Sequence, residues 1–351
     1  MAQAALVVGA SGATGAPLCE ELLRQGWKVY AISRRSPDLR NLAHAPQLNH
    51  LPLDLTDTRQ VRETLARCGD ITHVFYCANA ATQDLRQAMI EQLLDALAPL
   101  PDFERINFIQ GMKYYGCHLG PFRTPARETD PRVPGCDFYY TEEDMLIRRQ
   151  QGAPWSWTVL RPHAVCGNSR GNPLNIASAL AVYGSIQREL AAPLHFPGTQ
   201  QGFESLFQVV DARLLARAAI HVSTTEQCRN TAFNIHNGAW FRWSELWPAL
   251  ADAFSLLPAA PDNTHPADYF SGHEETWRRM TEKYRLRPFP YERLPRWALG
   301  EYSRPNGRIS CEYDICADTS RLHSTGFTEG VGNADMFLNI IQELRKESVI
   351  P

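Results

Sequence analysis

The stretch Gly9-Ala10-Ser11-Gly12-Ala13-Thr14-Gly15 decides the fold. It follows the apolar run Ala4-Ala5-Leu6-Val7-Val8, whose composition is typical of a buried parallel strand, and it precedes leucines at helical spacing. Glycines at this spacing allow a tight turn and let backbone N–H groups and a helix N-terminus approach a pyrophosphate. We therefore expect a dinucleotide at this turn, although a glycine-rich turn without a ligand can have the same spacing.

The end of the next predicted strand, residues 28–33, indicates which dinucleotide binds. After Ser33 come Arg34 and Arg35, at the place where an NAD-specific fold has a carboxylate for the ribose. Two guanidinium groups instead suit a 2′-phosphate, which they can bind bidentately. The pattern predicts NADPH as the cofactor, and a solvated pair of surface arginines is the alternative.

Strand and helix patterns alternate to about residue 165, which predicts an α/β fold with a doubly wound parallel sheet. Beyond the first two strands, further strands are expected at 51–55, 74–79, 105–110, 157–160, 207–210 and 232–235. Helices are expected at 57–68, 82–97, 138–151, 172–190 and 273–285. Residues 1–167 would form a dinucleotide-binding Rossmann domain, with 204–238 returning to the sheet. Residues 168–203 and 239–351 would form a smaller, mostly helical substrate lobe.

Composition excludes several functional classes. The 351-residue chain has a formal net charge of -3 and no basic stripe, which argues against a nucleic-acid partner. No apolar stretch is long enough to span a membrane, and Met1-Ala2-Gln3 leads directly into a core strand, leaving no room for a signal peptide. Nine cysteines without a Cys-x-x-Cys motif predict free thiols in the cytoplasm. Cys311 and Cys316 lack a histidine at zinc-ligand spacing, so no metal site is expected.

Several further blocks resemble the progesterone 5β-reductase and iridoid synthase-like family of atypical extended short-chain dehydrogenases. They include Gln110-Gly111-Met112-Lys113-Tyr114-Tyr115, Asp137-Phe138-Tyr139-Tyr140 and Leu160-Arg161-Pro162-His163. The order and spacing of the first two blocks are the most specific. The resemblance runs from the glycine turn to the terminal Val349-Ile350-Pro351 and covers nearly the whole chain. It implies NADPH-dependent reduction of the C=C bond of an apolar enone or enal, with Tyr140 binding the carbonyl and Lys113 assisting.

The same resemblance, together with the predicted strand ends, gives a set of cofactor contacts. Beside the glycine turn and the arginine pair, this set comprises Ser33, Asp54, Leu55, Cys77, Ala78, Asn79, Ile109, Gln110, Pro162 and Val165.

The position four residues after Tyr140 bears on the reaction. Short-chain dehydrogenases place a lysine there, but this chain has Asp144. Hydride addition to the β-carbon of an enone leaves negative charge on the carbonyl oxygen, so the essential protein group is a hydrogen-bond donor at that oxygen. Because solvent can later protonate the α-carbon, no tightly coupled Tyr-Lys relay is required.

Other readings stay open at this point. Tyr139 and Tyr140 could be ordinary aromatic residues at a helix start, Lys113 could be a surface lysine, and His163 could line the crevice without acid-base work. The aromatic residues Tyr183, Phe203, Trp240 and Trp243 could form a substrate pocket or the core. A carbonyl reductase or epimerase and a non-catalytic NADPH-sensing protein are the alternative functions, and a homodimer is one option for the assembly.

Overall fold

The computed structural model describes residues 3–39, 45–80, 82–169, 174–302 and 310–351. Its centre is a seven-stranded sheet with the order β11-β6-β5-β4-β1-β2-β3, in which every neighbouring pair is parallel. The strands are β1 (Ala4–Val8), β2 (Lys28–Ile32), β3 (Leu48–Leu51), β4 (His73–Tyr76), β5 (Arg105–Ile109), β6 (Ser156–Arg161) and β11 (Thr231–Asn234).

Helices cover both faces of this sheet, because its strands are apolar on both sides. In β1, Val7 packs in one core cluster with α1 (Gly15–Arg24) and α7 (Ala212–Thr224). Its neighbour Leu6 packs in another cluster with α2 (Thr58–Leu65), α3 (Gln83–Leu97) and α4 (Asp137–Gln150). The alternation of side chains along a strand separates the two clusters. The predicted doubly wound Rossmann-type sheet is confirmed.

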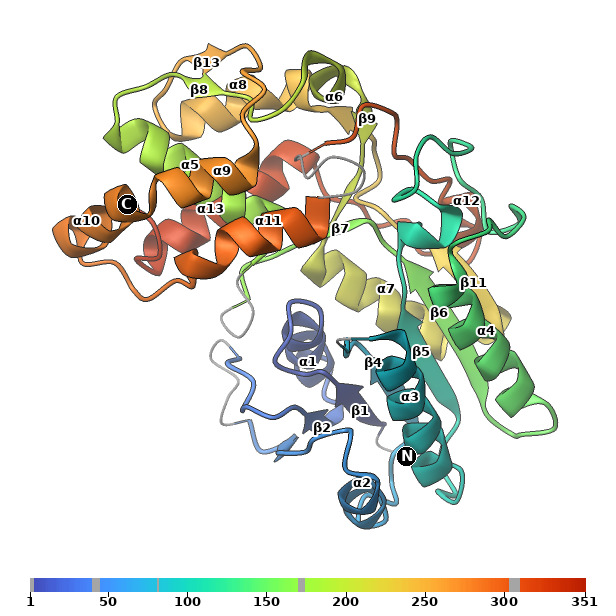
Figure 1. The fold of residues 1–351 in the computed structure, drawn as a ribbon. Coiled ribbons are helices and arrows are strands. Elements are labelled where there is room, and N and C mark those ends of the chain that lie inside the picture. Colours follow the sequence, from blue (N-terminus) through green and yellow to red (C-terminus); the bar gives the residue numbers. More distant parts are fainter. Residues whose placement is uncertain (1–2, 40–44, 81, 170–173, 303–309) are drawn as a thin grey trace.

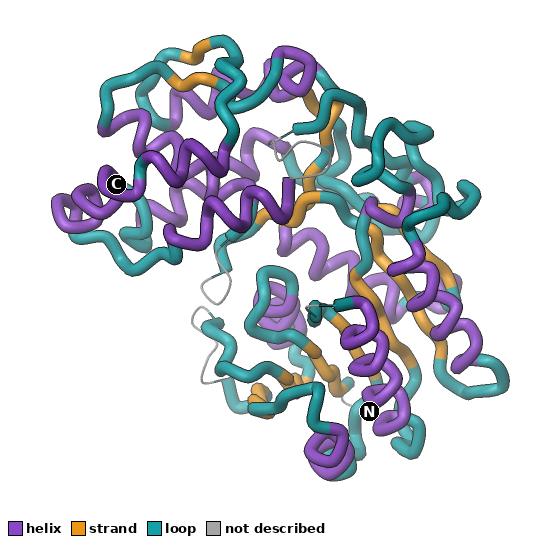
Figure 2. Tube along the Cα trace, in the orientation of Figure 1, coloured by secondary structure: helices purple, strands orange, loops and turns teal. Residues whose placement is uncertain are grey.

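A second, mostly helical region lies beside the sheet (Figure 1), and Figure 2 shows that helices dominate it while most strands lie in the other half. Its long helices are α5 (Ile176–Glu189), α8 (Trp243–Ala253), α10 (Glu274–Tyr284), α11 (Leu294–Tyr302) and α13 (Asn333–Lys346), with shorter α6 (Gln200–Glu204) and α9 (Pro266–Gly272). The short helix α12 (Ser320–His323) lies instead beside β11 of the main sheet. Three two-stranded pairs accompany them: β7 (Ala164–Cys166) with β10 (Val209–Asp211), β8 (Leu194–His195) with β13 (Pro258–Ala259), and β9 (Leu206–Phe207) with β12 (Phe241–Arg242).

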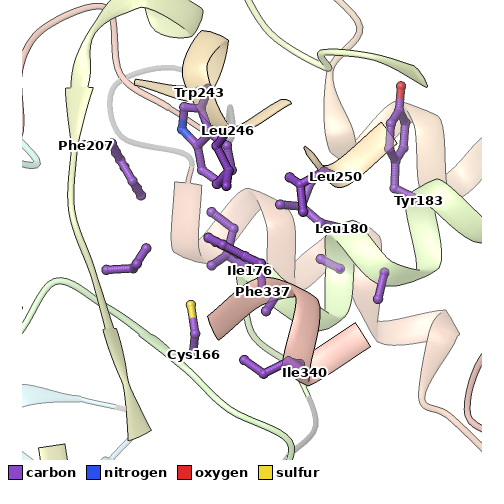
Figure 3. Packing of buried hydrophobic residues seen from close by; sticks show 14 of the residues in the cluster. Cys166, Ile176, Leu180, Tyr183, Phe207, Trp243, Leu246, Leu250, Phe337 and Ile340 are labelled. Atoms are coloured by element: carbon purple, nitrogen blue, oxygen red, sulfur yellow. The ribbon is translucent and has the colours of Figure 1, made fainter. Parts of the chain in front are cut away.

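The core of this lobe is rich in aromatic residues. Figure 3 shows Phe207, Trp243 and Phe337 gathered around the end of α5. Tyr183 and Trp243 are buried here, which favours the core reading for both of them. Phe203 packs against the same core, and Trp240 is exposed.

Two strand predictions were wrong. The third strand ends at Leu51 rather than covering residues 51–55, and Pro52, which has no N–H to donate, directly follows it. Residues 207–210 do not join the main sheet, because Val209–Asp211 pairs with β7 instead. The first residues of the predicted helix 172–190 lie outside the described residues, and the observed helix begins at Ile176, where the Asn175 side chain caps it.

Candidate active site

The glycine turn between β1 and α1 is built for close backbone approach. Gly9 has φ +86°, and a Cβ there would lie 2.8 Å from the backbone nitrogen of Ala78. A Cβ on Gly15 would collide with the carbonyl oxygen of Gly9. Thr14, at the N-cap of α1, makes no side-chain capping bond to the helix. In the first turn of this ten-residue helix, Pro17 has no N–H and the Ala16 N–H already donates to the Gly12 carbonyl at 3.1 Å. The close backbone approach at Gly9 and Gly15, together with the positive end of the helix dipole, therefore carries the fit to a dinucleotide pyrophosphate.

A cleft of about 370 Å³ opens beside this turn, between the sheet and the helical lobe. Seven of the predicted cofactor contacts line it: Ala13, Thr14, Asn79, Ile109, Gln110, Pro162 and Val165. The other lining residues include apolar and thiol side chains from the lobe and from the segment after β5, among them Met112, Cys117, Ile176, Phe207, Trp297, Cys311 and Ile315. The cleft therefore combines predicted dinucleotide contacts with a set of apolar and thiol side chains, which we call the apolar chamber.

Lys113 and Tyr139 are brought together on this cleft. Lys113 lies in the 3-10 turn η1 (Met112–Tyr115) that follows β5, and Tyr139 lies in the first turn of α4. The Tyr139 hydroxyl would come within 3.3 Å of a Cβ placed on Gly111, so it lies against the backbone that follows β5. Both side chains thus reach the carboxyl edge of the sheet, where ligands bind in such folds.

Tyr140, predicted to be the catalytic tyrosine, does not line the cleft. Only 6% of it is exposed, its hydroxyl donates to the backbone carbonyl of Tyr114 at 2.6 Å, and the same oxygen accepts from the Val133 N–H at 2.7 Å. This phenol joins three backbone segments. The geometry favours Tyr139 as the cleft phenol and Tyr140 as a structural one.

The place of the missing lysine is occupied by an ion pair. Asp144 accepts two hydrogen bonds from Arg132, at 2.6 and 2.7 Å, and those bonds hold the pKa of its carboxyl below the usual range. Its neighbour Glu143 accepts from the buried Arg161 at 2.8 Å and from the Tyr114 hydroxyl at 2.8 Å. The acids of α4 therefore fix the helix beneath the cleft.

One histidine and two cysteines of the cleft are held neutral. Burial, helped by the charge of Lys113, lowers the pKa of His163 to about 4, so its imidazole is uncharged at neutral pH. Burial also raises the pKa of the Cys117 and Cys311 thiols. Thiols with raised pKa values carry little thiolate and react slowly with electrophiles.

The predicted 2′-phosphate site follows β2. Arg34 and Arg35 are exposed there, and the Ser33 hydroxyl donates to the Arg35 carbonyl at 2.6 Å. Asp54 has a pKa below its usual range, because the backbone N–H and hydroxyl of Thr56 donate to it and Arg34 adds a smaller effect. Leu55 is buried in the core, and Cys77 and Ala78 are partly buried at the end of β4. Cofactor contacts by these residues stay predictions.

Comparison with known proteins identifies the group. The model of the PRISE-like Rossmann-fold domain matches residues 5–290. The chain belongs to this PRISE-like family. It is 35% identical over 267 residues to the short chain dehydrogenase gsfE of Penicillium aethiopicum, covering 72% of this chain and 71% of that protein.

Two plant relatives in the PRISE-like group are more distant. The chain is 29% identical to the 3-oxo-Delta(4,5)-steroid 5-beta-reductase of Arabidopsis thaliana, over 84% of this chain and 80% of that protein. It is 28% identical to the (S)-8-oxocitronellyl enol synthase of Antirrhinum majus, over 99% of this chain and 92% of the relative. The predicted resemblance is confirmed.

Solved structures place this PRISE-like chain in the extended short-chain dehydrogenase fold. UDP-glucose 4-epimerase of Thermus thermophilus, in complex with NAD, superposes with a TM-score of 0.67 at 17% identity, over 98% of this chain and 99% of that one. The fold implies that NAD or NADP binds, and together with the family match it makes this chain an oxidoreductase of the extended short-chain dehydrogenase type. Within the described residues, no helix is long and apolar enough to cross a membrane, and no three metal-ligating side chains cluster together.

Proposed function

We propose that this protein uses NADPH to reduce the C=C bond of a small, apolar α,β-unsaturated carbonyl compound. The observation that carries the proposal is that Lys113 and Tyr139 line one cleft, whose lining also includes predicted dinucleotide contacts and the apolar chamber. Two relatives support the same chemistry: a 3-oxo-Delta(4,5)-steroid has a carbonyl beside a C=C bond, and an enol is what hydride addition to such a bond leaves after O-protonation.

The bound dinucleotide would supply the hydride to the β-carbon. Tyr139 would donate a hydrogen bond to the carbonyl oxygen, where negative charge gathers as the β-carbon is attacked. Lys113 would add a positive charge on the same side of the cleft and contact the nicotinamide ribose. The α-carbon would take its proton from solvent, so the product carries one hydride and one proton across the former double bond. Here Tyr139 takes the role predicted for Tyr140.

The two thiols and the imidazole that line the cleft are neutral, which suits an electrophilic substrate. An enone alkylates thiolates, yet the pKa values of Cys117 and Cys311 are raised by burial, so both side chains remain thiols at neutral pH. The uncharged imidazole of His163 can both donate and accept a hydrogen bond without placing a charge in the chamber.

The preference for NADPH rests on Arg34 and Arg35, exposed after β2. Either guanidinium could form charge-assisted hydrogen bonds to a 2′-phosphate. No carboxylate follows β2 directly to hold a free ribose hydroxyl.

A panel of acceptors tests the reaction class. NADPH oxidation is followed at saturating cofactor with a cyclic enone, a linear enal, a steroid enone and the matched saturated ketones, and each product is identified. We expect turnover of at least one enone or enal and none of its saturated ketone. Turnover of ketones alone would replace the proposal with a carbonyl reductase, and tight NADPH binding without any turnover would replace it with a sensing protein.

A further inference from the structure

A buried arginine in α3 connects the dinucleotide edge to the helix that carries Tyr139. Arg86 is 6% exposed; its Nε donates to Glu142 Oε2 at 2.7 Å, and its Nη1 donates to the backbone carbonyl of Ala78 at 2.6 Å. Its guanidinium carbon lies 5.2 Å from the centre of the Tyr76 ring and 5.5 Å from that of Phe138. One side chain therefore touches the end of β4, where the cofactor is expected, and the first turns of α4.

Arg86 contacts one residue before Tyr139 in α4 and one residue after it. Phe138 and Glu142 are four residues apart, so they share one face of α4, and Tyr139 lies between them in sequence. Gln110, which lines the cleft, adds a second tie: its amide donates to Glu142 Oε1 and to the Tyr139 carbonyl, both at 3.3 Å. Rotation of the helix about its axis, and thus the direction of the Tyr139 phenol, is fixed by this set.

One donor nitrogen of the Arg86 guanidinium takes no part in these bonds. Its Nη2 is buried and has no hydrogen-bond partner among the described residues. Burial by itself lowers the pKa of Arg86, but the charge of Glu142 and its hydrogen bond, with smaller contributions from Tyr76 and Tyr139, outweigh burial, so the pKa is raised. The guanidinium thus remains charged, within electrostatic reach of the Tyr139 phenol. A buried orphan donor on a buried cation calls for an explanation beyond packing.

We propose that Arg86 is the positioning cation of the cleft tyrosine: it sets the direction of the Tyr139 side chain through Glu142 and Phe138 and keeps a positive charge within electrostatic reach of its phenol, a task that the helix lysine performs in ordinary short-chain dehydrogenases. The inference rests on the proposed function only in giving Tyr139 the donor role. A nearby cation makes a phenol a stronger hydrogen-bond donor, which favours the enolate of the proposed reaction.

A purely structural role predicts something different. If Arg86 only holds α3 against α4, then replacing Arg86 and replacing Glu142 should shift the titration of Tyr139 in the same direction, because both changes break the same ion pair. If its charge acts on Tyr139, the two ends have opposite consequences, because Arg86→Met removes a positive charge near the phenol and Glu142→Gln removes a negative one. The other charged or titratable groups around Tyr139 are Glu143, one turn along its own helix, and Lys113, His118 and His163, which line the same cleft. The variants leave these four unchanged.

The experiment is an NMR titration of protein labelled with ¹³Cζ-tyrosine, in which the Tyr139 signal is assigned by its loss in Tyr139→Phe. We expect Arg86→Met to raise the Tyr139 titration midpoint by about half a pH unit or more, Glu142→Gln to lower it, and Arg86→Lys to keep it close to wild type. The matched control is Arg149→Met, which breaks an exposed ion pair with Asp95 between the same two helices and should leave the midpoint in place.

Shifts of the same sign in Arg86→Met and Glu142→Gln, or no shift in either, would overturn the proposal. Glu142→Gln and Arg86→Lys keep the test decisive if Arg86→Met does not fold. Steady-state kinetics with any acceptor that the wild type reduces adds a second readout: kcat should fall roughly tenfold in Arg86→Met, with KM little changed. Because the titration needs no turnover, failure of the enone-reductase assignment leaves it intact.

Discussion

The hydroxyl of Tyr140 donates a 2.6 Å hydrogen bond to the backbone carbonyl of Tyr114, the residue that follows Lys113. This bond holds η1 against α4. It also removes the Tyr140 phenol from the cleft, while the adjacent Tyr139 lines it. In the proposed function Tyr139 serves the reaction and Tyr140 the structure, and each role can be tested by deleting one hydroxyl.

Tyr139→Phe should lower kcat by about 10²–10³, the scale seen when one donor to a developing oxyanion is lost, and should leave NADPH binding and thermal stability nearly unchanged. Steady-state kinetics with an enone, together with a cofactor titration, checks this. Wild-type kcat in the variant would exclude Tyr139 as the donor.

Tyr140→Phe should act on stability instead. The change leaves the buried Tyr114 carbonyl and the Val133 N–H without their hydrogen-bond partner, which should lower the free energy of unfolding by about 1–3 kcal/mol. Chemical denaturation of the two tyrosine variants side by side measures the difference. The reverse pattern, a stable Tyr140→Phe protein without turnover, would restore the prediction made from the sequence.

The one-residue difference shows what the sequence can and cannot specify. The glycine turn and the alternation of strands and helices were enough to place the sheet, α4 and Lys113. The direction in which each tyrosine of α4 points depends on the rotation of that helix. The rotation is set by buried ion pairs of Glu142 and Glu143, whose partners Arg86 and Arg161 are 56 and 18 residues away. Pairing across such separations has no periodic signature.

A signal for Arg86 was nevertheless present. In α3, the buried residues Met89, Ile90, Leu93 and Leu97 follow Arg86 at three, four, seven and eleven positions, so the arginine begins the apolar face of its helix. A charge in that position indicates either a surface end of the helix or a buried partner. The third strand was misplaced for a simpler reason, since Pro52 interrupts an otherwise strand-like run.

The dinucleotide preference should depend on the arginine pair after β2. We expect NADPH to bind more tightly than NADH, and Arg34→Ala/Arg35→Ala to remove most of that difference, because each charge-assisted bond contributes about 1.5–3 kcal/mol. Titration of both dinucleotides into wild type and variant by calorimetry checks this. Equal affinities in the wild type would show that the arginines are ordinary surface residues.

The cleft thiols should resist alkylation while the protein is folded. Burial raises the pKa values of Cys117 and Cys311, so iodoacetamide at neutral pH should modify them at least about tenfold more slowly than a free cysteine. Peptide mapping by mass spectrometry gives the rate for each residue, with urea-unfolded protein as the control. Rapid labelling of either residue in the folded protein would remove this support for an electrophilic substrate.

His73 should make stability depend on pH. It is buried beside Trp27 and bonded to the Ser223 carbonyl at 3.1 Å; burial, with a smaller effect of Arg105, lowers its pKa to about 4. Below pH 6.5 His73 is protonated in the unfolded chain but stays neutral in the folded protein until the pH approaches 4. The free energy of unfolding therefore falls between pH 6.5 and pH 4. One such histidine should cost about 2 kcal/mol on going from pH 7.5 to pH 5.

Chemical denaturation of wild type and His73→Gln at the two pH values measures this contribution of His73. The loss should be smaller in the variant. An identical loss in both proteins would mean that His73 is protonated in the folded state at pH 5.

The most direct test of the central claim is the destination of the hydride. The protein is incubated with NADPH deuterated at the transferable C4 position and with an enone that it turns over, and the product is analysed by NMR. The account predicts deuterium on the former β-carbon of a saturated ketone, with the α-carbon proton drawn from solvent. Deuterium on a carbinol carbon of an allylic alcohol would contradict it.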